Sequence, residues 1–198
     1  ELLAERGIEV SYETIRCWTI KFGHRFAHNL KARRPPPSPR WHLDEMVCKI
    51  GGRRVYLWRA VDDEGEVLDL LVQKNRDTVS ALRLLKALIM NQPTFPESIT
   101  TDRYRAYGLA LRIIGLDDIH KCEGRRKNNR AENSHLPIRR RERKMQLFKS
   151  PLSAQNFLNT HAAVYNTFYI QPHLVSRPTL RKFRSDAHAV WNEATAAT

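Results

Sequence analysis

The sequence of 198 residues predicts an α/β domain, a mixed five-stranded sheet with flanking helices, preceded by a partial helix-turn-helix. Two observations predict it. Helical periodicity fills residues 1–31 up to a proline-rich stretch, and short β-branched-rich apolar runs alternate with amphipathic segments after that stretch. We expect a helical module at 1–31, a linker at 32–40, a larger domain at 41–185 and a C-terminal tail at 186–198.

The N-terminal module begins inside a helix, at Glu1 rather than at Met, so we expect it to be incomplete. Gly7 ends this first helix, and Ser11 is a suitable N-cap for a second one because its hydroxyl can accept from a first-turn N–H. Apolar residues then recur on one helical face: Ile15, Trp18, Phe22 and Phe26. Helix, short turn and helix is the helix-turn-helix pattern, with Arg16 on the outer face, although ordinary helical hairpins share it.

Beyond the linker, two short breaks separate three apolar runs. Gly51-Gly52 and "DDEG" at 62–65 predict two hairpins, hence a three-stranded antiparallel meander. The expected strands are 41–50, 53–62, 66–73, 97–102 and 118–122, and the expected helices are 77–92, 103–114, one from about Asn129, and 152–169. Pro137 should interrupt or kink the third of these helices because it supplies no N–H. A meander followed by alternating helices and strands is the order of the ribonuclease-H-like fold.

The formal net charge of +13 is concentrated in one region. Residues 121–150 hold eleven Lys or Arg and three acids, which is +8 of the total. Such a density indicates nucleic-acid binding, since phosphate neutralisation releases counterions, although a solvated basic helix face is the plain alternative. The candidate DNA-binding residues are Lys127, Arg130, Arg139, Arg140, Arg141, Arg143, Lys144 and Arg16.

Cysteine usage argues against disulfide scaffolds and zinc fingers. The three cysteines are far apart and form no C-x-x-C pair, and His120 with Cys122 has no second ligand pair. No apolar run approaches the ~20 residues of a membrane span, and no signal peptide is visible. We therefore expect a chain with reduced thiols in the cytoplasm.

Three carboxylates form the candidate metal site. Asp44 lies mid-way along the first expected strand and Asp102 ends the fourth, and in a ribonuclease-H-like sheet these positions are neighbours. Glu132 lies on a later helix that crosses the same edge. Three carboxylates suit two Mg²⁺ or Mn²⁺ ions ~3.5–4 Å apart, the arrangement used for in-line phosphoryl displacement.

Each of these acids has another possible role. Glu45 rivals Asp44, but alternation puts the two on opposite faces of the strand, so we expect only Asp44 to point at the site. Asp102 can also cap the following helix, and Glu132 can form a surface ion pair with Arg139 or Lys127. A histidine one helical turn after Glu132, His135, either orients a carboxylate, touches phosphate or lies on the surface.

The segments "WHLDE", "TTDRYRAYG" and "NNRAENSHLPIRRRERKMQLFKS" resemble the DDE transposases of the bacterial insertion-sequence-six family, whose catalytic domain is similar to that of retroviral integrases. The resemblance implies that Asp44, Asp102 and Glu132 are the catalytic, metal-binding triad, and that Arg139 contacts the element's end. It also implies double-stranded DNA as partner, association with the bacterial nucleoid, and a homodimer or larger assembly. The interval of 29 residues between Asp102 and Glu132 is shorter than usual in the family.

The predicted function is therefore metal-dependent DNA cleavage and strand transfer at the terminal inverted repeats of an insertion sequence. Two alternatives remain open. One is a ribonuclease-H-like nuclease without strand transfer, which would use the same carboxylates. The other is a catalytically inactive DNA-binding remnant of a transposase, in which the three carboxylates do not converge.

Overall fold

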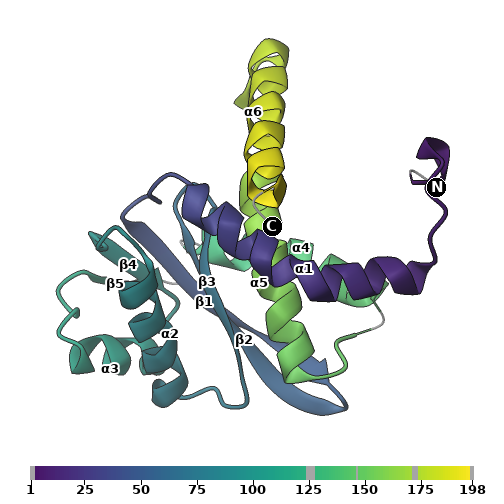
Figure 1. Ribbon diagram of the computed structural model, residues 1–198. Helices are drawn as coiled ribbons and strands as arrows, with labels where there is room; N and C mark the ends of the chain where they lie inside the picture. The colour runs from purple at the N-terminus through teal and green to yellow at the C-terminus, as the bar shows by residue number, and fades with distance from the viewer. Residues whose placement is uncertain (1–2, 124–127, 146, 171–173, 197–198) are drawn as a thin grey trace. The chain divides into compact units, whose positions relative to one another are not determined.

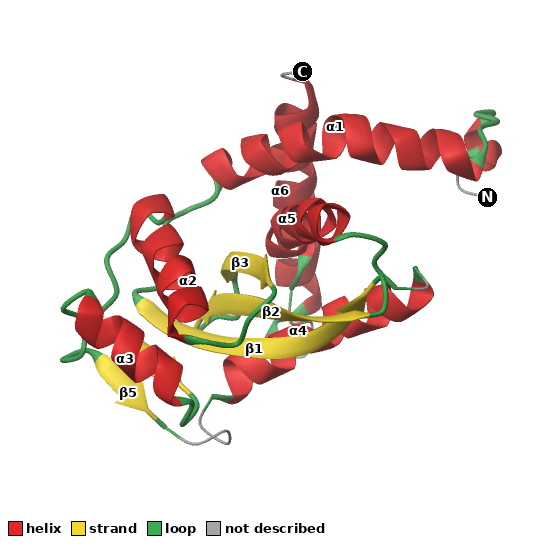
Figure 2. Ribbon diagram, turned by 90° about the horizontal axis from the view of Figure 1, so that it is seen from below, coloured by secondary structure: helices red, strands yellow, loops and turns green. Residues whose placement is uncertain are grey.

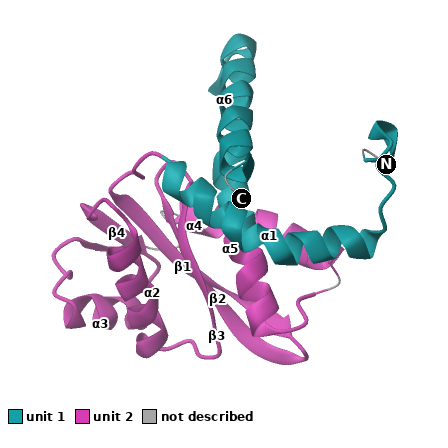
Figure 3. Ribbon diagram, in the orientation of Figure 1, with its two compact units in different colours: residues 1–34, 160–198 teal, residues 35–159 magenta. Residues whose placement is uncertain are grey.

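The computed structural model describes residues 3–123, 128–145, 147–170 and 174–196 (Figure 1). The chain divides into two compact units, residues 1–34 with 160–198, and residues 35–159 (Figure 3). The elements in chain order are η1 (Ala4–Arg6), α1 (Tyr12–Arg33), β1 (Arg40–Ile50), β2 (Arg53–Asp62), β3 (Val67–Gln73), α2 (Thr78–Asn91), β4 (Ser98–Thr101), α3 (Arg105–Ile113), β5 (His120–Cys122), α4 (Asn129–Lys144), α5 (Pro151–Phe168) and α6 (Arg177–Ala196).

The larger unit contains a five-stranded mixed sheet with strand order β3-β2-β1-β4-β5. The first three strands pair antiparallel, while β4 pairs parallel with both β1 and β5. Gly51 and Gly52 form the β1–β2 turn with φ of 56° and 77°, the left-handed backbone that a tight hairpin needs and glycine adopts without strain. The expected meander and the expected fourth and fifth strands are thus confirmed.

The two faces of this sheet are covered by different helices. α2 and α3 lie on one face and α4 lies on the other (Figure 2). Trp41, Leu43 and Glu45 of β1 point to the α2–α3 face, so His42, Asp44 and Met46 point to the α4 face. The core on the α2–α3 side is a fully buried cluster that includes Trp41, Leu43, Trp58, Leu68, Leu84, Leu85, Leu88, Ile99, Tyr107 and Leu111.

Helix α4 packs on the sheet through its one apolar stripe. Ala131, Ser134, His135, Ile138 and Glu142 are buried, with the i, i+3, i+4, i+7 and i+11 spacing of a single helix face. Of the interruption or kink expected at Pro137, the interruption is wrong, since α4 runs as one helix from Asn129 to Lys144 with the proline inside it. Packing of this stripe against β1 and β2 offsets the backbone hydrogen bond that proline cannot make.

The outer edge of the sheet is β3, and a side chain of α5 covers part of it. Gln155 Oε1 accepts from the Val72 N–H at 2.8 Å, and Gln155 Nε2 donates to the Leu70 carbonyl at 2.9 Å. These two backbone groups of β3 are therefore satisfied by one side-chain amide.

The smaller unit consists of α1, α6 and the second half of α5. Phe26 of α1 and Phe168 of α5 both contact Trp191 of α6, at ring-centroid distances of 6.0 and 5.7 Å. Ser11 caps α1 as expected, its hydroxyl accepting from the Thr14 N–H at 3.1 Å.

The N-terminal region differs from the expected helix pair. The described residues before α1 form only the short helix Ala4–Arg6, so a complete helix-turn-helix is not present in residues 3–33. On the face expected to be apolar, Ile15 and Trp18 are exposed whereas Phe22 and Phe26 are half-buried, because only the second half of α1 has helices packed on it. The region expected as a tail, residues 186–198, continues α6 up to Ala196, and residues 160–185 belong to the helical unit.

No helix in the described ranges combines the length and the apolar character needed to cross a membrane.

Candidate active site

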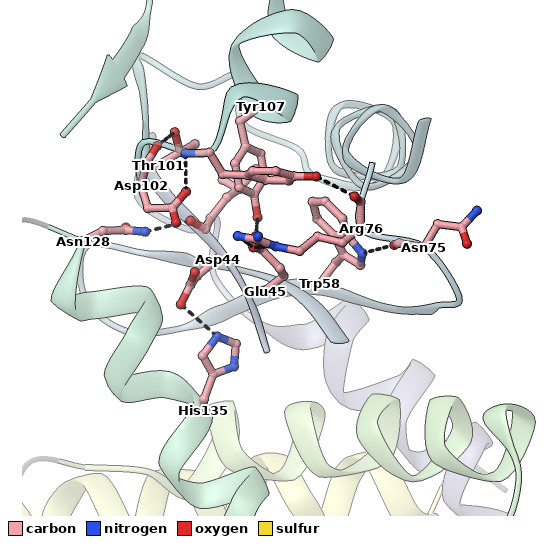
Figure 4. A network of polar contacts seen from close by, with 12 residues as sticks. Asp44, Glu45, Trp58, Asn75, Arg76, Thr101, Asp102, Tyr107, Asn128 and His135 are labelled. Atoms are coloured by element: carbon pink, nitrogen blue, oxygen red, sulfur yellow. Dashed lines mark hydrogen bonds and ion pairs between the residues drawn. The ribbon is translucent and has the colours of Figure 1, made fainter. Parts of the chain in front are cut away.

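Asp44 and Asp102 lie side by side because of the strand register. Leu43 of β1 pairs with Thr101 of β4 in parallel; Asp44 is the next residue of β1, and Asp102 directly follows the last residue of β4. Oxygen atoms of Asp44, Asp102 and Glu45 all lie within 4.8 Å of one another (Figure 4). The convergence predicted for the two aspartates is what the structure shows.

Asp102 also stabilises the backbone before α3. Its Oδ1 accepts from the Tyr104 N–H at 2.9 Å, an interaction typical of an aspartate with the backbone two residues further along a turn. Its other oxygen accepts no hydrogen bond from the described residues. Asp102 therefore shapes the turn and still presents a free oxygen beside Asp44.

Asp44 is in contact with α4 through His135. Nε2 of this histidine lies 3.2 Å from Oδ2 of Asp44, and the histidine is 4% exposed. Burial lowers the pKa of His135, which the neighbouring Asp44 carboxylate opposes. In the neutral imidazole Nε2–H donates to Asp44, whose second oxygen has no hydrogen-bond donor among the described residues. Of the three roles considered for His135, contact with a carboxylate is the one observed.

Glu132 lies between two contacts that fix α4 to β1. The buried Asn128, just before the helix, donates from Nδ2 to the Leu43 carbonyl at 2.8 Å, and His135 contacts Asp44. Glu132 itself is exposed in the first turn of α4 and is not part of the carboxylate group within 4.8 Å. Among the described residues it forms no ion pair with Arg139, and the other partner considered, Lys127, lies outside the described ranges.

Glu45 is closer to the site than alternation alone predicts. It does lie on the opposite face of β1 from Asp44, yet one of its oxygens is within 4.8 Å of both aspartates. Arg76 and Tyr107 hold it there, at 2.5 and 2.8 Å. Burial raises the pKa of the Glu45 carboxyl, an effect that the hydrogen bonds from Tyr107 and Arg76 oppose. The same burial, with Glu45 beside it, raises the pKa of Tyr107 well above the ordinary value.

Sequence reasoning did not assign a role at the site to Arg76 or Tyr107. They stand 31 and 62 positions from Glu45, on a loop and on α3, and no local pattern links an acid to partners so distant. Tyr107 lies within the helix expected at 103–114, where an aromatic residue is most simply part of the core. A charged residue just before the capping Asp77 was the single sign that could have drawn attention to Arg76.

The exposed face of α4 is basic. Six of the predicted DNA-binding residues are exposed on it, and none forms an ion pair with an acid in the described part of the chain: Arg130, Arg139, Arg140, Arg141, Arg143 and Lys144. Arg16 is in the other unit and is paired with Glu13, its Nε donating at 2.8 Å. Lys127 lies outside the described residues.

The short interval between Asp102 and Glu132 still contains the expected fifth strand, β5. β5 pairs parallel with β4 through His120, Lys121 and Cys122. The shortening therefore does not remove the fifth strand, and residues 124–127, before α4, lie outside the described ranges.

Residues 38–170 match the family of DDE domains of the IS240 type. The chain is 31% identical over 170 residues to the transposase for insertion sequence-like element IS431mec of Staphylococcus aureus (strain N315), which covers 83% of this chain and 74% of that protein. It is 30% identical, with the same coverage, to the transposase for insertion sequence element IS257 in transposon Tn4003 of Staphylococcus aureus.

Among solved structures, the chain is similar to one in the cryo-EM structure of the simian T-cell lymphotropic virus intasome in complex with PP2A regulatory subunit B56 gamma. The TM-score is 0.51 at 16% identity, and the likeness covers 73% of this chain and 58% of the other. With the observed strand order, this likeness confirms the expected ribonuclease-H-like fold class.

Proposed function

Because the chain belongs to the DDE transposases of the insertion-sequence-six family, we propose that it cuts and joins DNA at the terminal inverted repeats of an insertion sequence. The observation that carries this proposal is the pair Asp44 and Asp102, brought together by adjacent parallel strands. Two half-buried carboxylates side by side on neighbouring inner strands repel each other unless a cation lies between them, so their placement indicates a cation site.

The donor set fits a hard divalent cation such as Mg²⁺ or Mn²⁺. Asp44 and Asp102 are both partly exposed, and each keeps one oxygen free of hydrogen bonds from the described residues. We assign these two carboxylates, with Glu132 as the third, to metal binding. Bound there, the metal would activate the attacking oxygen and stabilise the charge on the leaving 3′ oxygen.

The chain's own residues have separate tasks in this scheme. Asp44 and Asp102 supply negative charge at fixed positions, and His135 holds the Asp44 carboxylate in one orientation. Asn128 and His135 hold the first turns of α4 against β1, so Glu132 stands on a helix whose start is anchored beside the site. The arginines on the exposed face of α4 bind the DNA backbone that presents the scissile phosphate.

We further infer that the enzyme works on two double-stranded DNA ends as a homodimer or larger assembly. Water would first release a 3′ hydroxyl at the element's end. That hydroxyl would then attack the target DNA. Both displacements use the same carboxylate site and need no covalent enzyme intermediate.

The test supplies labelled end-bearing DNA, target DNA and Mg²⁺, and measures joined product for the unmodified protein, Asp44→Asn, Asp102→Asn and Glu132→Gln. The expected result is joined product from the unmodified protein alone. Glu97→Gln, an exposed acid away from the site, is the matched control and should retain activity. DNA binding without product indicates the inactive remnant, and cleavage without joining indicates the simple nuclease. Equal product from Glu132→Gln removes Glu132 from the site.

A further inference from the structure

Glu45 differs from its two acidic neighbours in how its oxygens are occupied. Oε1 accepts from Nε and from the second guanidinium nitrogen of Arg76, both at 2.5 Å, and Oε2 accepts from the Tyr107 hydroxyl at 2.8 Å. Its side chain is 3% exposed. Asp44 and Asp102, in contrast, each keep one oxygen that accepts no hydrogen bond from the described residues.

Arg76 is itself held in a fixed position. Its carbonyl accepts from the Tyr104 hydroxyl at 2.5 Å, and its guanidinium carbon lies 3.9 Å from the centre of the Tyr104 ring. A guanidinium stacked on an aromatic face and engaged with a carboxylate loses little further freedom. Figure 4 shows Arg76 and Tyr107 meeting Glu45 on the side of β1 away from His135.

We infer that Arg76 is a positioning residue that keeps Glu45 out of the metal's ligand set. Glu45 has an oxygen within 4.8 Å of both aspartates and is adjacent to Asp44 in sequence, so by distance alone it is a competing ligand. With Arg76 and Tyr107 in place, both of its oxygens are occupied and its charge is balanced. The metal then takes Asp44 and Asp102, with Glu132 as the proposed third ligand.

The expected consequence of losing Arg76 follows from the burial of Glu45. A buried carboxylate without a partner is strongly unfavourable, and the nearest alternative partner is the cation held by the aspartates. An added carboxylate ligand strengthens binding of a hard cation. Removing Arg76 should therefore tighten metal binding while it displaces the metal from its productive position.

The direction in which metal affinity changes when Arg76 is removed distinguishes exclusion of Glu45 from simple structural support of the site. If Arg76 merely supported the site, its removal would weaken metal affinity by about 10–100-fold, as is usual for residues behind metal ligands. If it excludes Glu45, metal affinity rises while strand transfer falls. The inference rests on the proposed function, since it presumes that Asp44 and Asp102 hold the metal.

The experiment measures Mn²⁺ binding by calorimetry, and strand transfer in parallel, with the full chain. The unmodified protein is compared with Arg76→Met, Glu45→Gln/Arg76→Met and Asp44→Asn. We expect Arg76→Met to bind Mn²⁺ about tenfold more tightly, a step of the size that one extra carboxylate gives. The double variant should return both affinity and strand transfer toward those of the unmodified protein, because a glutamine is a poor ligand and needs no counter-charge.

Tyr107→Phe is the second variant, needed in case Arg76→Met does not fold. This variant removes the hydrogen bond to Oε2 of Glu45 without changing any charge. If Arg76 affects metal binding only through its charge, the Mn²⁺ affinity of Tyr107→Phe should be unchanged. Exclusion of Glu45 predicts tighter Mn²⁺ binding in this variant too. Arg83→Met, an exposed arginine on α2, is the matched control and should bind as the unmodified protein does.

Two results would overturn the inference. One is unchanged or weaker Mn²⁺ affinity in both Arg76→Met and Tyr107→Phe while Asp44→Asn abolishes binding; the proposed metal site then stands and the role of Arg76 falls. The other is equal Mn²⁺ binding by the unmodified protein and Asp44→Asn, which rejects the metal site and the inference with it.

Discussion

Nε2 of His135 lies 3.2 Å from Oδ2 of Asp44, so a buried imidazole on α4 orients a carboxylate on β1. Since burial favours the neutral ring, the contact is a hydrogen bond from Nε2–H and not a permanent ion pair. It fixes which oxygen of Asp44 stays free for the proposed metal. It also ties the helix that carries Glu132 to the strand that carries Asp44.

His135→Ala should lower the strand-transfer rate by about 10–100-fold, the usual cost of losing a residue that orients a metal ligand. His135→Gln keeps an N–H donor and should recover part of the rate. DNA binding in metal-free buffer should stay unchanged in both variants. Leu136→Ala, an exposed neighbour on the same helix, is the control. Full activity of His135→Ala would show that Asp44 needs no orientation from α4.

Replacing Arg139, Arg140 and Arg141 together with Ala should flatten the salt dependence of DNA binding. Each lost phosphate contact reduces the slope of log K against log salt by about 0.9 for duplex DNA, so we expect a reduction of about 2–3. The matched control replaces Arg83, Lys86 and Arg112, which are exposed on α2 and α3, and should leave the slope nearly unchanged. Equal slopes in the two triple variants would mean that the basic face of α4 does not touch phosphate.

Asn128→Ala should destabilise the larger unit by about 1–3 kcal/mol, because the Leu43 carbonyl loses a buried hydrogen-bond donor. The start of α4 would also lose one of its two anchors on β1. Chemical denaturation of this variant, compared with Asn129→Ala at the exposed next position, measures the effect. Similar unfolding free energies for the two variants would contradict the anchoring role.

Glu142→Gln should stabilise the protein at neutral pH. Glu142 is on the buried face of α4, and burial raises its pKa in the folded state, opposed by Arg139 and Arg143. A raised folded-state pKa contributes stability below the unfolded-state pKa, and this contribution is lost as pH rises through the folded-state value.

Thermal unfolding of Glu142→Gln and of the unmodified protein should therefore coincide most closely near pH 4 and diverge toward pH 7, where the variant melts higher. Glu64→Gln, at an exposed acid of the β2–β3 turn, provides the comparison. A variant that is less stable than the unmodified protein at pH 7 would show that the Glu142 carboxylate is stabilised by its arginine neighbours after all.

The strands of the sheet could be predicted closely because short turn sequences mark where they end. Gly51-Gly52 and the "DDEG" break mark the hairpins, and the first strand, expected at 41–50, is observed at Arg40–Ile50. The α4 helix could not be predicted through its proline, since packing on the sheet decides it. The sequence of α1 likewise shows one apolar face along the helix. Which residues of that face are buried could not be predicted, because burial depends on contacts with other helices.

Only part of the candidate site could be predicted, namely the residues whose positions follow from the order of the strands. Asp44 and Asp102 follow from strand position, because the sheet order places a mid-strand residue beside a strand end. The partners of Glu45 come from other elements, and alternation describes only the direction of a side chain, not how near its end lies to a neighbour. Arg76 and Tyr107 therefore needed the structure.

Gln155 imitates a sixth strand at the outer edge of the sheet, because its amide offers β3 the same acceptor and donor that a neighbouring peptide group would. A strand of another molecule could pair with β3 at Leu70–Val72 only after displacing the Gln155 side chain. Conversion of this glutamine to glutamate would leave the acceptor but delete the donor, uncovering the Leu70 carbonyl. One amide side chain thus occupies the two backbone groups that a strand from another molecule would need at this position.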